Sequence, residues 1–561
     1  MARADVEPTR PEGDLDPTDP WQREAQTFPR LSEEMVERAS RYGGAEELPP
    51  HTPVFSRGDR GRDFFVILEG SIEIFEQDDD GTVRLLRPQI AREFTGELDL
   101  FNDRMILVNG RTGPAPTRVV RIKRADFRRL VQSEPDIGEI IMRAFILRRV
   151  GLIRHGQGAV VLIGPAHSAD TLRLQQFLTR NAYPVRVLDT EQDADAEGFL
   201  ECFSLTAAEL PVIVLPGRHA LRNPSLAALA DALGITEDFD HAIVFDVAVV
   251  GAGPAGLAAA VYAASEGLQT IVLESIAPGG QAGTSSKIEN YLGFPTGISG
   301  EALAGRAQVQ AQKFGARLAV SREVTGIDCD DLPYRLKLDD GASVRARAIV
   351  IATGARYRKL DVAGFERFEG QGVYYAATAM EAKLCEAADV IVVGGGNSAG
   401  QAAVFLSRTC RHVHVLVRGP GLAATMSDYL VQRIARSKRI SLQVHSEIVG
   451  LEGEQGLSAV TWRDHRSGAE TNKPVSAIFA MIGAEPNTGW VDGCLELDAK
   501  GFVVTGAAAG QGADSPYATS RPGVYAVGDV RSGSVKRVAS GVGEGSVVVQ
   551  AVHRFLHPPE A

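Results

Sequence analysis

The sequence predicts a multidomain protein in which a β-roll with a helix and a small α/β unit precede two larger Rossmann-type α/β domains. Three observations predict this fold class. The 561 residues exceed what one hydrophobic core organises. Short alternating segments such as DFFVILEGSIEIFEQ (63–77) mark the first part of the chain as strand-rich. Glycine-rich strand-turn-helix units occur at 246–275 and at 389–419.

Composition and charge exclude several classes of protein. With 44% hydrophobic and 23% charged residues, the chain is typical of a globular protein. The net charge of −12 argues against a nucleic-acid partner, because neutralising phosphates needs a basic face. We interpret one basic run, from Lys123 to Arg154, as the solvated side of a helix. Since no run of about 18 apolar residues occurs, no membrane span or membrane partner is expected.

The N-terminus and the cysteines indicate a cytoplasmic protein. Residues 1–30 are acidic and proline-rich, lack the apolar core of a signal peptide, and are expected to form a disordered tail. The cysteines are odd in number, and none lies in a Cys-x-x-Cys pair. This pattern predicts reduced thiols, with neither a disulfide framework nor a metal site. The five cysteines are Cys202, Cys329, Cys385, Cys410 and Cys494.

Two smaller domains are expected before the glycine-rich units. Residues 31–155 combine short strands with helical spacing of apolar residues at 123–150, which predicts a small barrel followed by one long helix. Residues 158–240 alternate buried strands, such as AVVLIGP (159–165), with helices such as SLAALADALGI (225–235). This second pattern predicts a compact α/β unit.

The first glycine-rich unit carries Gly251-x-Gly253-x-x-Gly256 between an apolar strand and a helix. Such glycines permit a tight turn and the close approach of a pyrophosphate, which the N–H groups of the helix N-terminus face. The next strand ends in Glu274, 18 residues after Gly256, where a carboxylate can accept a hydrogen bond from a ribose hydroxyl. The pattern predicts a Rossmann-type dinucleotide site.

The second unit carries Gly394-x-Gly396-x-x-Ala399, and its following strand ends near Arg418 instead of an acid. A guanidinium can pair with the additional phosphate of NADP, so NADPH is the expected nucleotide. A surface arginine without a ligand is the alternative reading. Two such sites in one chain are typical of a flavoprotein that takes hydride from a nicotinamide.

Residues 245–561 resemble the low-molecular-weight thioredoxin reductase family. The matching stretches include PGGQA (278–282), IENYLGFP (288–295), GVYAVGDV (523–530) and KRVASGVGEG (536–545). The resemblance implies an FAD domain at 243–358 and 485–561, an inserted NADPH domain at 359–484, and a homodimer. It implies that FAD is held by Gly251, Gly253, Ala255, Gly256, Glu274, Gly280, Gln281, Asn290, Thr353, Gly354, Asp529, Arg537 and Ala539.

Two departures from the family pattern bear on function. The family has a His-Arg-Arg run after the second unit, where this chain has Val417-Arg418-Gly419. The family carries Cys-Ala-Thr-Cys where this chain has Ala376 and Ala379, so the two-cysteine relay to thioredoxin is lost. Cys385 is expected to be a buried structural residue at a helix end.

About 100 residues within the domain expected at 31–155 resemble the cyclic-nucleotide-binding domain family, through VFSRGD (54–59), FFVILEGSIEI (64–74) and FTGELDL (94–100). The resemblance implies a phosphate-cradling turn at Gly96, with Glu97 accepting from a ribose hydroxyl. The family's phosphate arginine has no counterpart at its usual spacing, and Arg104 substitutes for it only if the loop is shortened. Two readings stay open, a cyclic-nucleotide site and a docking module without ligand.

Residues 158–240 resemble a thioredoxin or glutaredoxin fold through their strand order, without a redox cysteine pair in the loop 164–171. A plain α/β spacer is the alternative. His167 in that loop is expected to be a loop residue, not a catalyst.

The leading hypothesis is an FAD-dependent oxidoreductase that oxidises NADPH, with no side-chain catalyst assigned. A cyclic nucleotide is a candidate regulator, and the electron acceptor is a redox protein, a quinone or a remote disulfide. Ferredoxin-NADP reductases of the thioredoxin-reductase type share the scaffold without the cysteine pair, so direct electron transfer to a partner protein is one alternative. A non-catalytic sensor or scaffold that binds FAD is the other.

Overall fold

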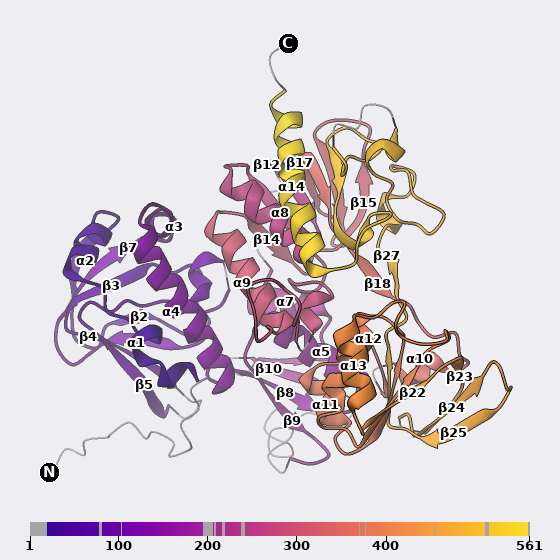
Figure 1. The fold of residues 1–561 in the computed structure, drawn as a ribbon. Helices are drawn as coiled ribbons and strands as arrows, with labels where there is room; N and C mark the ends of the chain where they lie inside the picture. The colour runs from indigo at the N-terminus through magenta and orange to yellow at the C-terminus, as the bar shows by residue number, and fades with distance from the viewer. Residues whose placement is uncertain are drawn as a thin grey trace. The chain divides into compact units, whose positions relative to one another are not determined.

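The computed structural model describes residues 19–77, 81–102, 104–193, 206, 209–215, 219–236, 240, 242–285, 287–369, 371–375, 377–454, 456–510 and 515–558 (Figure 1). The chain forms two compact units. One holds most of the first 240 residues together with 308–322, and the other holds 166–173 and most of the chain from 241 onward.

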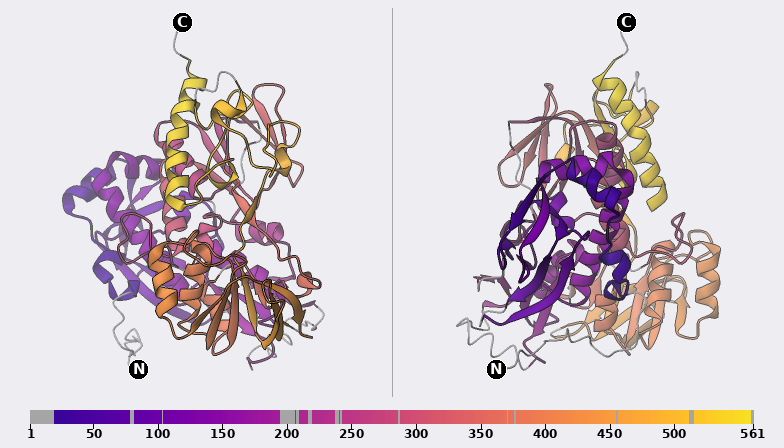
Figure 2. Two further views of the ribbon diagram at one scale, coloured as in Figure 1. Left: turned by 45° about the vertical axis from the view of Figure 1, so that its right-hand side comes forward. Right: turned by 90° about the vertical axis from the view of Figure 1, so that its left-hand side faces the viewer.

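The N-terminal domain is a β-roll, whose strands face the viewer in the right-hand view of Figure 2. Its two sheets have the orders β1-β7-β3 and β2-β6-β4-β5. Phe64, Phe94, Phe127 and Phe145 fill its core. The strands are β1 (Gly44–Leu48), β2 (Pro53–Phe55), β3 (Phe64–Glu69), β4 (Ser71–Gln77), β5 (Val83–Ile90), β6 (Asn109–Thr112) and β7 (Thr117–Ile122).

Two helices, and not the one long helix expected at 123–150, follow the β-roll. They are α3 (Arg124–Ser133) and α4 (Pro135–Arg154). Pro135 has no backbone N–H and fixes φ, so it ends α3 and begins α4. A single-turn helix, η2 (Leu98–Phe101), lies within the roll directly after Gly96 and Glu97.

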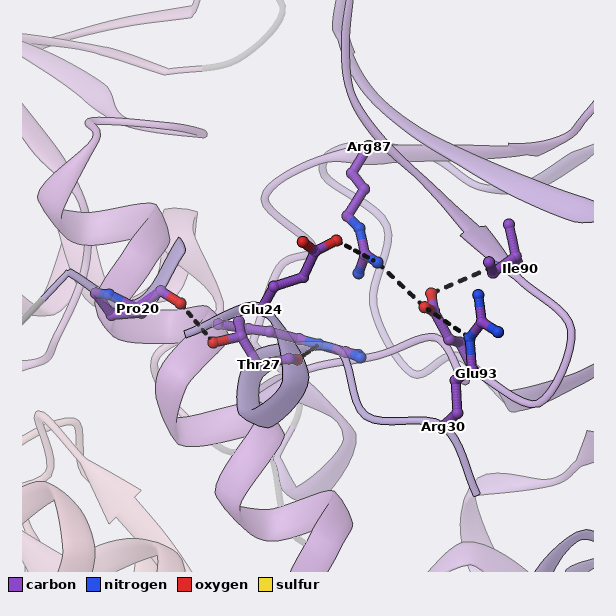
Figure 3. Close-up of polar contacts among 8 residues, drawn as sticks. Pro20, Glu24, Thr27, Arg30, Arg87, Ile90 and Glu93 are labelled. Atoms are coloured by element: carbon purple, nitrogen blue, oxygen red, sulfur yellow. Dashed lines mark hydrogen bonds and ion pairs between the residues drawn. The ribbon is translucent and has the colours of Figure 1, made fainter. Parts of the chain in front are cut away.

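Residues 19–30 have a defined structure, which corrects the expected disorder for that part of 1–30; residues 1–18 lie outside the described residues. They form η1 (Pro20–Gln22) and α1 (Glu24–Thr27), followed by α2 (Glu33–Ser40). Figure 3 shows Arg87 of β5 between Glu24 and Glu93, at 3.1 Å from each. Arg148 of α4 donates to the carbonyl oxygen of Thr27 at 3.0 Å. The composition of the tail could not reveal these distant partners.

The basic run at 123–154 is only partly a solvated helix face. Arg129 and Arg143 are exposed and pair with acids on their own helices. Arg148 and Arg149 are buried, with 4% and 3% of their surface exposed. The prediction is therefore wrong for these two residues, because each guanidinium finds acceptors on elements far away in sequence.

The second domain has the expected α/β pattern, with a four-stranded sheet in the order β11-β10-β8-β9. β8 and β9 are parallel, whereas β10 and β11 are antiparallel to their neighbours. The elements are β8 (Val160–Gly164), α5 (Ala169–Arg180), β9 (Val185–Asp189), β10 (Val212–Leu215), β11 (His219–Arg222) and α7 (Leu226–Leu233).

The third domain has a sheet in which β13, β12, β17, β16 and β15 follow one another and β28 pairs with β17. Helices α8 (Pro254–Ser265) and α14 (Val538–Leu556) pack together beside it (Figure 1). The strands are β12 (Val244–Val250), β13 (Thr270–Glu274), β14 (Arg317–Val320), β15 (Val324–Asp328), β16 (Tyr334–Leu338), β17 (Ser343–Ile351) and β28 (Val524–Ala526). The other helices are η4 (Ala282–Thr284), α9 (Gly300–Lys313), η5 (Gly489–Val491), η6 (Gly506–Ala509) and η7 (Gly528–Val530).

The fourth domain has a parallel sheet in the order β19-β26-β20-β21-β22 and a three-stranded sheet, β23-β24-β25. The pair β18 (Ala355–Tyr357) and β27 (Ala484–Pro486) connects it to the third domain. Its strands are β19 (Val373–Tyr374), β20 (Asp389–Val393), β21 (His412–Leu416), β22 (Ile440–Gln443), β23 (Ser446–Glu452), β24 (Ala459–Asp464), β25 (Glu470–Pro474) and β26 (Ala477–Ala480). Its helices are α10 (Phe365–Phe368), α11 (Ala379–Leu384), α12 (Asn397–Leu406) and α13 (Asp428–Arg436).

A disulfide joins Cys329 and Cys494, which corrects the expectation that all thiols are reduced. Cys329 follows β15, and Cys494 follows η5. The two Cα atoms lie 6.2 Å apart, a distance that a disulfide spans. Their separation of 165 residues hides this proximity from sequence reasoning. Cys385 and Cys410 are free and buried, and Cys202 lies outside the described residues.

Among the helices in the described part of the chain, none has the length and apolar character needed to cross a membrane.

Candidate functional site

The turn between β12 and α8 requires glycine at two positions. Gly251 has φ of +101°, and a Cβ there would lie 2.4 Å from the carbonyl oxygen of Ala352. A Cβ at Gly256 would lie 1.9 Å from the carbonyl oxygen of Gly251. The turn, the helix and the end of β17 are therefore packed more closely than any side chain allows.

The same turn leaves room where the expected ligand would pass. Gly253 precedes the first turn of α8, and the nearest atom to a Cβ there would be the Cα of Gly280, 4.0 Å away. Gly280 has φ of +53° and also presents backbone only. N–H groups at a helix N-terminus attract anions. These residues fit the pyrophosphate of a dinucleotide, because no side chain obstructs the helix N-terminus.

Glu274 ends β13 beside this turn. Its Oε2 accepts from the N–H of Ala252 at 2.8 Å, and its Oε1 accepts from the N–H of Ile276 at 3.0 Å. These bonds fix the carboxylate, whose remaining lone pairs can accept from a ribose hydroxyl. The structure therefore brings Glu274 to the turn carrying Gly251 and Gly253.

A second group of predicted residues lies at the ends of β17 and β28. The Thr353 hydroxyl donates to the carbonyl oxygen of Asn487 at 2.8 Å, and the Gln281 amide donates to the carbonyl oxygen of Ala355. Gly354 has φ of +64° and open space where a Cβ would lie. Asp529 lies in η7, where burial raises the pKa of its carboxyl and Lys536 opposes that shift. Asn290, Arg537 and Ala539 are exposed, and their part in the site stays a prediction.

The sequence analysis used KRVASGVGEG (536–545) only for the family resemblance and did not predict that the helix it begins supports this site. Ala255 faces Gly541 and Gly545 of α14, and a Cβ at Gly545 would lie 2.1 Å from the carbonyl oxygen of Ala255. Glu544 of α14 accepts from the N–H of Gly528 at 2.7 Å and pairs with Arg531 at 2.8 Å. The motif GVGEG within 541–545 was the available signal, since small residues permit close helix packing.

The second glycine-rich turn, between β20 and α12, has similar constraints. Gly394 has φ of +137°, and a Cβ there would lie 2.2 Å from the carbonyl oxygen of Met481. Gly396 precedes α12 and has open space where its Cβ would be. Arg418 is exposed two residues beyond β21. The missed residue is Asn397, whose side chain accepts from the N–H of Ser427 at 2.7 Å and ties α13 to this turn.

The segment that carries cysteines in the resembled family is a capped helix start. Ala376 lies outside the described residues, and Ala379 begins α11. Glu381 accepts from the N–H of Thr378 at 2.9 Å, which is a typical N-terminal cap. Cys385 follows the end of α11, is 2% exposed, and has its pKa raised to about 12 by burial. The expectation that Cys385 is buried at a helix end is confirmed.

The predicted cyclic-nucleotide residues lie in the β-roll at η2. Gly96 has φ of +101°, and Glu97 follows it. The carboxylate of Glu97 accepts from Arg149 of α4 at 2.6 Å through Nε and again through Nη2. Arg104 is buried, and its Nη1 donates to the carbonyl oxygen of Asn181 at 2.6 Å. His167 of the second domain is exposed.

Comparisons with known proteins define the class. Residues 245–545 match the family of pyridine nucleotide-disulphide oxidoreductases, and residues 45–134 match the cyclic nucleotide-binding domain. The chain belongs to the pyridine nucleotide-disulphide oxidoreductase family and carries an N-terminal cyclic nucleotide-binding domain.

Individual relatives agree with this assignment. The chain is 34% identical over 312 residues to a thioredoxin reductase of Treponema pallidum, which covers 56% of this chain and 97% of the relative. It is 30% identical over 313 residues to an NADH dehydrogenase of Bacillus subtilis, covering 56% of this chain and 58% of the relative. A crystal structure of Lactococcus lactis thioredoxin reductase matches with a TM-score of 0.52 at 30% identity, covering 56% of this chain and 99% of that chain.

The chain is therefore a thioredoxin-reductase-like flavoprotein oxidoreductase, and the cofactors of this family are FAD and NADPH. The two glycine-rich turns described above have the backbone space that two dinucleotides need.

Proposed function

We propose that this protein oxidises NADPH through bound FAD and passes the electrons to an external acceptor without a cysteine relay of its own. The observation that carries the proposal is the contrast between two intact nucleotide turns and the absence of a Cys-x-x-Cys pair from the sequence. A disulfide reductase needs a thiolate that attacks its substrate, and alanine at 376 and 379 supplies none.

The role of this chain's residues is to bind and orient the two nucleotides. Gly251, Gly253 and Gly280 would leave the pyrophosphate of FAD facing backbone N–H groups, while Glu274 and Asp529 would accept from its hydroxyls. Gly394 and Gly396 would do the same for NADPH. When bound, FAD supplies hydride acceptance from nicotinamide. Catalysis would come mostly from positioning the two nucleotides, and no side chain is assigned proton transfer.

The acceptor is proposed to be a redox protein or a quinone. The free thiols support this choice, because burial raises the pKa of both Cys385 and Cys410 and keeps each in its unreactive form. Direct electron transfer from the flavin to a partner protein, as in ferredoxin-NADP reductases, is one form of this proposal. A homodimer and a cytoplasmic location belong to the same proposal, and light scattering on the purified protein would test the first.

Anaerobic stopped-flow spectroscopy tests the proposal. The purified yellow protein is mixed with NADPH or with NADH, and the flavin absorbance is followed. We expect rapid bleaching by NADPH and slower bleaching by NADH. If neither nucleotide bleaches the flavin, the enzyme reading fails and the non-catalytic sensor or scaffold takes its place. Reoxidation by added quinone or ferredoxin, compared with thioredoxin, then identifies the class of acceptor.

Regulation by a cyclic nucleotide is a separate part of the prediction. It requires that Glu97 is free to accept from a ribose hydroxyl and that Arg104 is free to donate to a phosphate, and the contacts of these two residues argue for a different role.

A further inference from the structure

Glu97 already has a charged partner within the chain. Arg149 of α4 binds its carboxylate through two nitrogens, with Nε at 2.6 Å from Oε2. Both residues are buried, at 8% and 3% exposure. A paired arrangement of this kind is among the strongest hydrogen-bonded contacts, and it occupies the carboxylate that a ribose hydroxyl would need.

The two arginines beside Glu97 also have partners, and both partners belong to one turn. Arg104 donates to the carbonyl oxygen of Asn181 at 2.6 Å, and Arg149 lies 3.4 Å from the carbonyl oxygen of Ala182. These carbonyls follow the end of α5 in the small α/β domain, which lies with the β-roll in one compact unit. Carbonyl oxygens carry partial negative charge, so two of them facing two guanidinium groups satisfy donors that an anion would otherwise satisfy.

The turn is shaped to present these oxygens. Ala182 has φ of +52°, a left-handed conformation that an alanine adopts only where its surroundings hold it. The Asn181 amide donates to the carbonyl oxygen of Phe177 at 2.9 Å. Asn181 and Tyr183 are buried, at 1% and 2% exposure. The turn is therefore held by a hydrogen bond within its own domain, and its residues 181 and 183 are buried.

The buried charges of this site favour its occupation by the turn. Glu97, Asp99, Arg104 and Arg149 are all buried within one cluster. Burial, and then the neighbouring Arg149, lowers the pKa of Arg104 to about 10. Buried guanidinium groups are costly to leave unpaired, and the two carbonyls relieve that cost without adding a charge.

Further hydrogen bonds belong to the same interface between the β-roll and the small α/β domain, which we call the joint. Glu76 of β4 accepts from the N–H of Gly158 at 2.8 Å, and Arg57 donates to the carbonyl oxygen of Ala159 at 3.0 Å. Arg60 donates to the carbonyl oxygen of Asp231 at 2.8 Å. The joint therefore has several anchoring points besides the Glu97 cluster.

We propose that the turn at 181–183 is an internal ligand of the site formed by Glu97, Arg104 and Arg149. The β-roll then binds the small α/β domain through this turn. Because the turn occupies the site, a cyclic nucleotide cannot bind there at the same time. Of the two readings left open by the sequence, the structure favours docking over nucleotide binding. The inference does not depend on the flavin chemistry proposed above.

The first test uses the unmodified full-length protein. Isothermal titration calorimetry with cyclic AMP and with cyclic GMP is expected to give no binding heat at millimolar ligand. Hydrogen exchange at 178–188 is expected to be slow and unchanged by either nucleotide. Saturable binding of either nucleotide, whether or not it speeds exchange at the turn, would overturn the proposal.

The second test compares two arginines of α4. Arg149→Ala removes the contacts to Glu97 and to Ala182, whereas Arg143→Ala removes only an exposed pair with Glu139 on the same helix. We expect exchange at 178–188 to rise at least tenfold in R149A and to stay unchanged in R143A. Equal exchange in both variants would refute the docking role. If R149A does not fold, Arg104→Gln replaces it, with the same expectation at the turn.

Discussion

Replacing Arg418 with alanine tests the predicted choice of NADPH. Arg418 is exposed beyond the end of β21, next to the turn that carries Gly394 and Gly396. A hydrogen bond to a charged group is worth about 1.5–3 kcal/mol, and solvent exposure reduces such pairs to about 1 kcal/mol. We therefore expect R418A to weaken NADPH binding roughly five- to tenfold. NADH binding should not change, because NADH lacks the additional phosphate.

The assay is the concentration dependence of flavin reduction under anaerobic conditions, measured with both nucleotides. Arg411→Ala is the matched control, since Arg411 is also exposed but pairs with Asp389 at 2.8 Å, where β20 begins. The difference between NADPH and NADH should also shrink at high salt, because screening weakens exposed charge pairs. An equal loss for both nucleotides in R418A, or no loss for either, would refute the assignment of Arg418 to the phosphate.

Three further predictions concern the turn, the disulfide and the missing cysteines. Gly251→Ala should lower the FAD content of the purified protein, because the added Cβ would lie 2.4 Å from a carbonyl oxygen. Gly305→Ala is the control and should keep its FAD, since its Cβ would meet nothing within 4 Å. Equal flavin absorbance in the two variants would contradict this prediction. Cys494→Ser should lower the free energy of unfolding by up to roughly 5 kcal/mol, because the disulfide closes a 165-residue loop and so restricts the unfolded chain. Urea titrations measure this, and dithiothreitol should destabilise only the unmodified protein. The double variant Ala376→Cys and Ala379→Cys should gain NADPH-dependent reduction of a small disulfide if the inserted domain can turn, and A379C alone should not.

The nucleotide turns were predictable from sequence because their constraints are local. Gly251 and Gly256 lie five residues apart in one strand-turn-helix unit. Two constraints arise within it, the φ of +101° at Gly251 and the clash of a Cβ at Gly256 with the carbonyl oxygen of Gly251, whereas the clash at Gly251 is with the distant Ala352. The break between α3 and α4 was also available, since Pro135 stands at the first position of α4. The spacing of apolar residues concealed it by continuing across both helices.

The joint at Glu97 could not be predicted because its partners are distant in sequence. Arg149 lies 52 residues after Glu97, and Asn181 lies 77 residues after Arg104. A basic residue on a helix is usually solvated, so nothing in the local pattern indicates that Arg149 is buried against a carboxylate. The Cys329–Cys494 pair is hidden for the same reason.

The position of the Cys329–Cys494 disulfide in the sheet determines whether it can exchange electrons with a flavin. The strand register places Asp328, next to Cys329, level with Arg335 of β16 and Arg345 of β17. Arg345 lies six residues before Ile351, where β17 ends close to Thr353, so the disulfide is set back about 20 Å along the strand direction from that end. Ligands of such sheets bind outside the carboxyl ends of the strands. Among the described cysteines, this pair is therefore too far from a flavin at that edge, and the other two are buried thiols. The positions of these four cysteines support the proposal that electrons leave the flavin directly for an external acceptor, and the reoxidation assay tests which class of acceptor takes them.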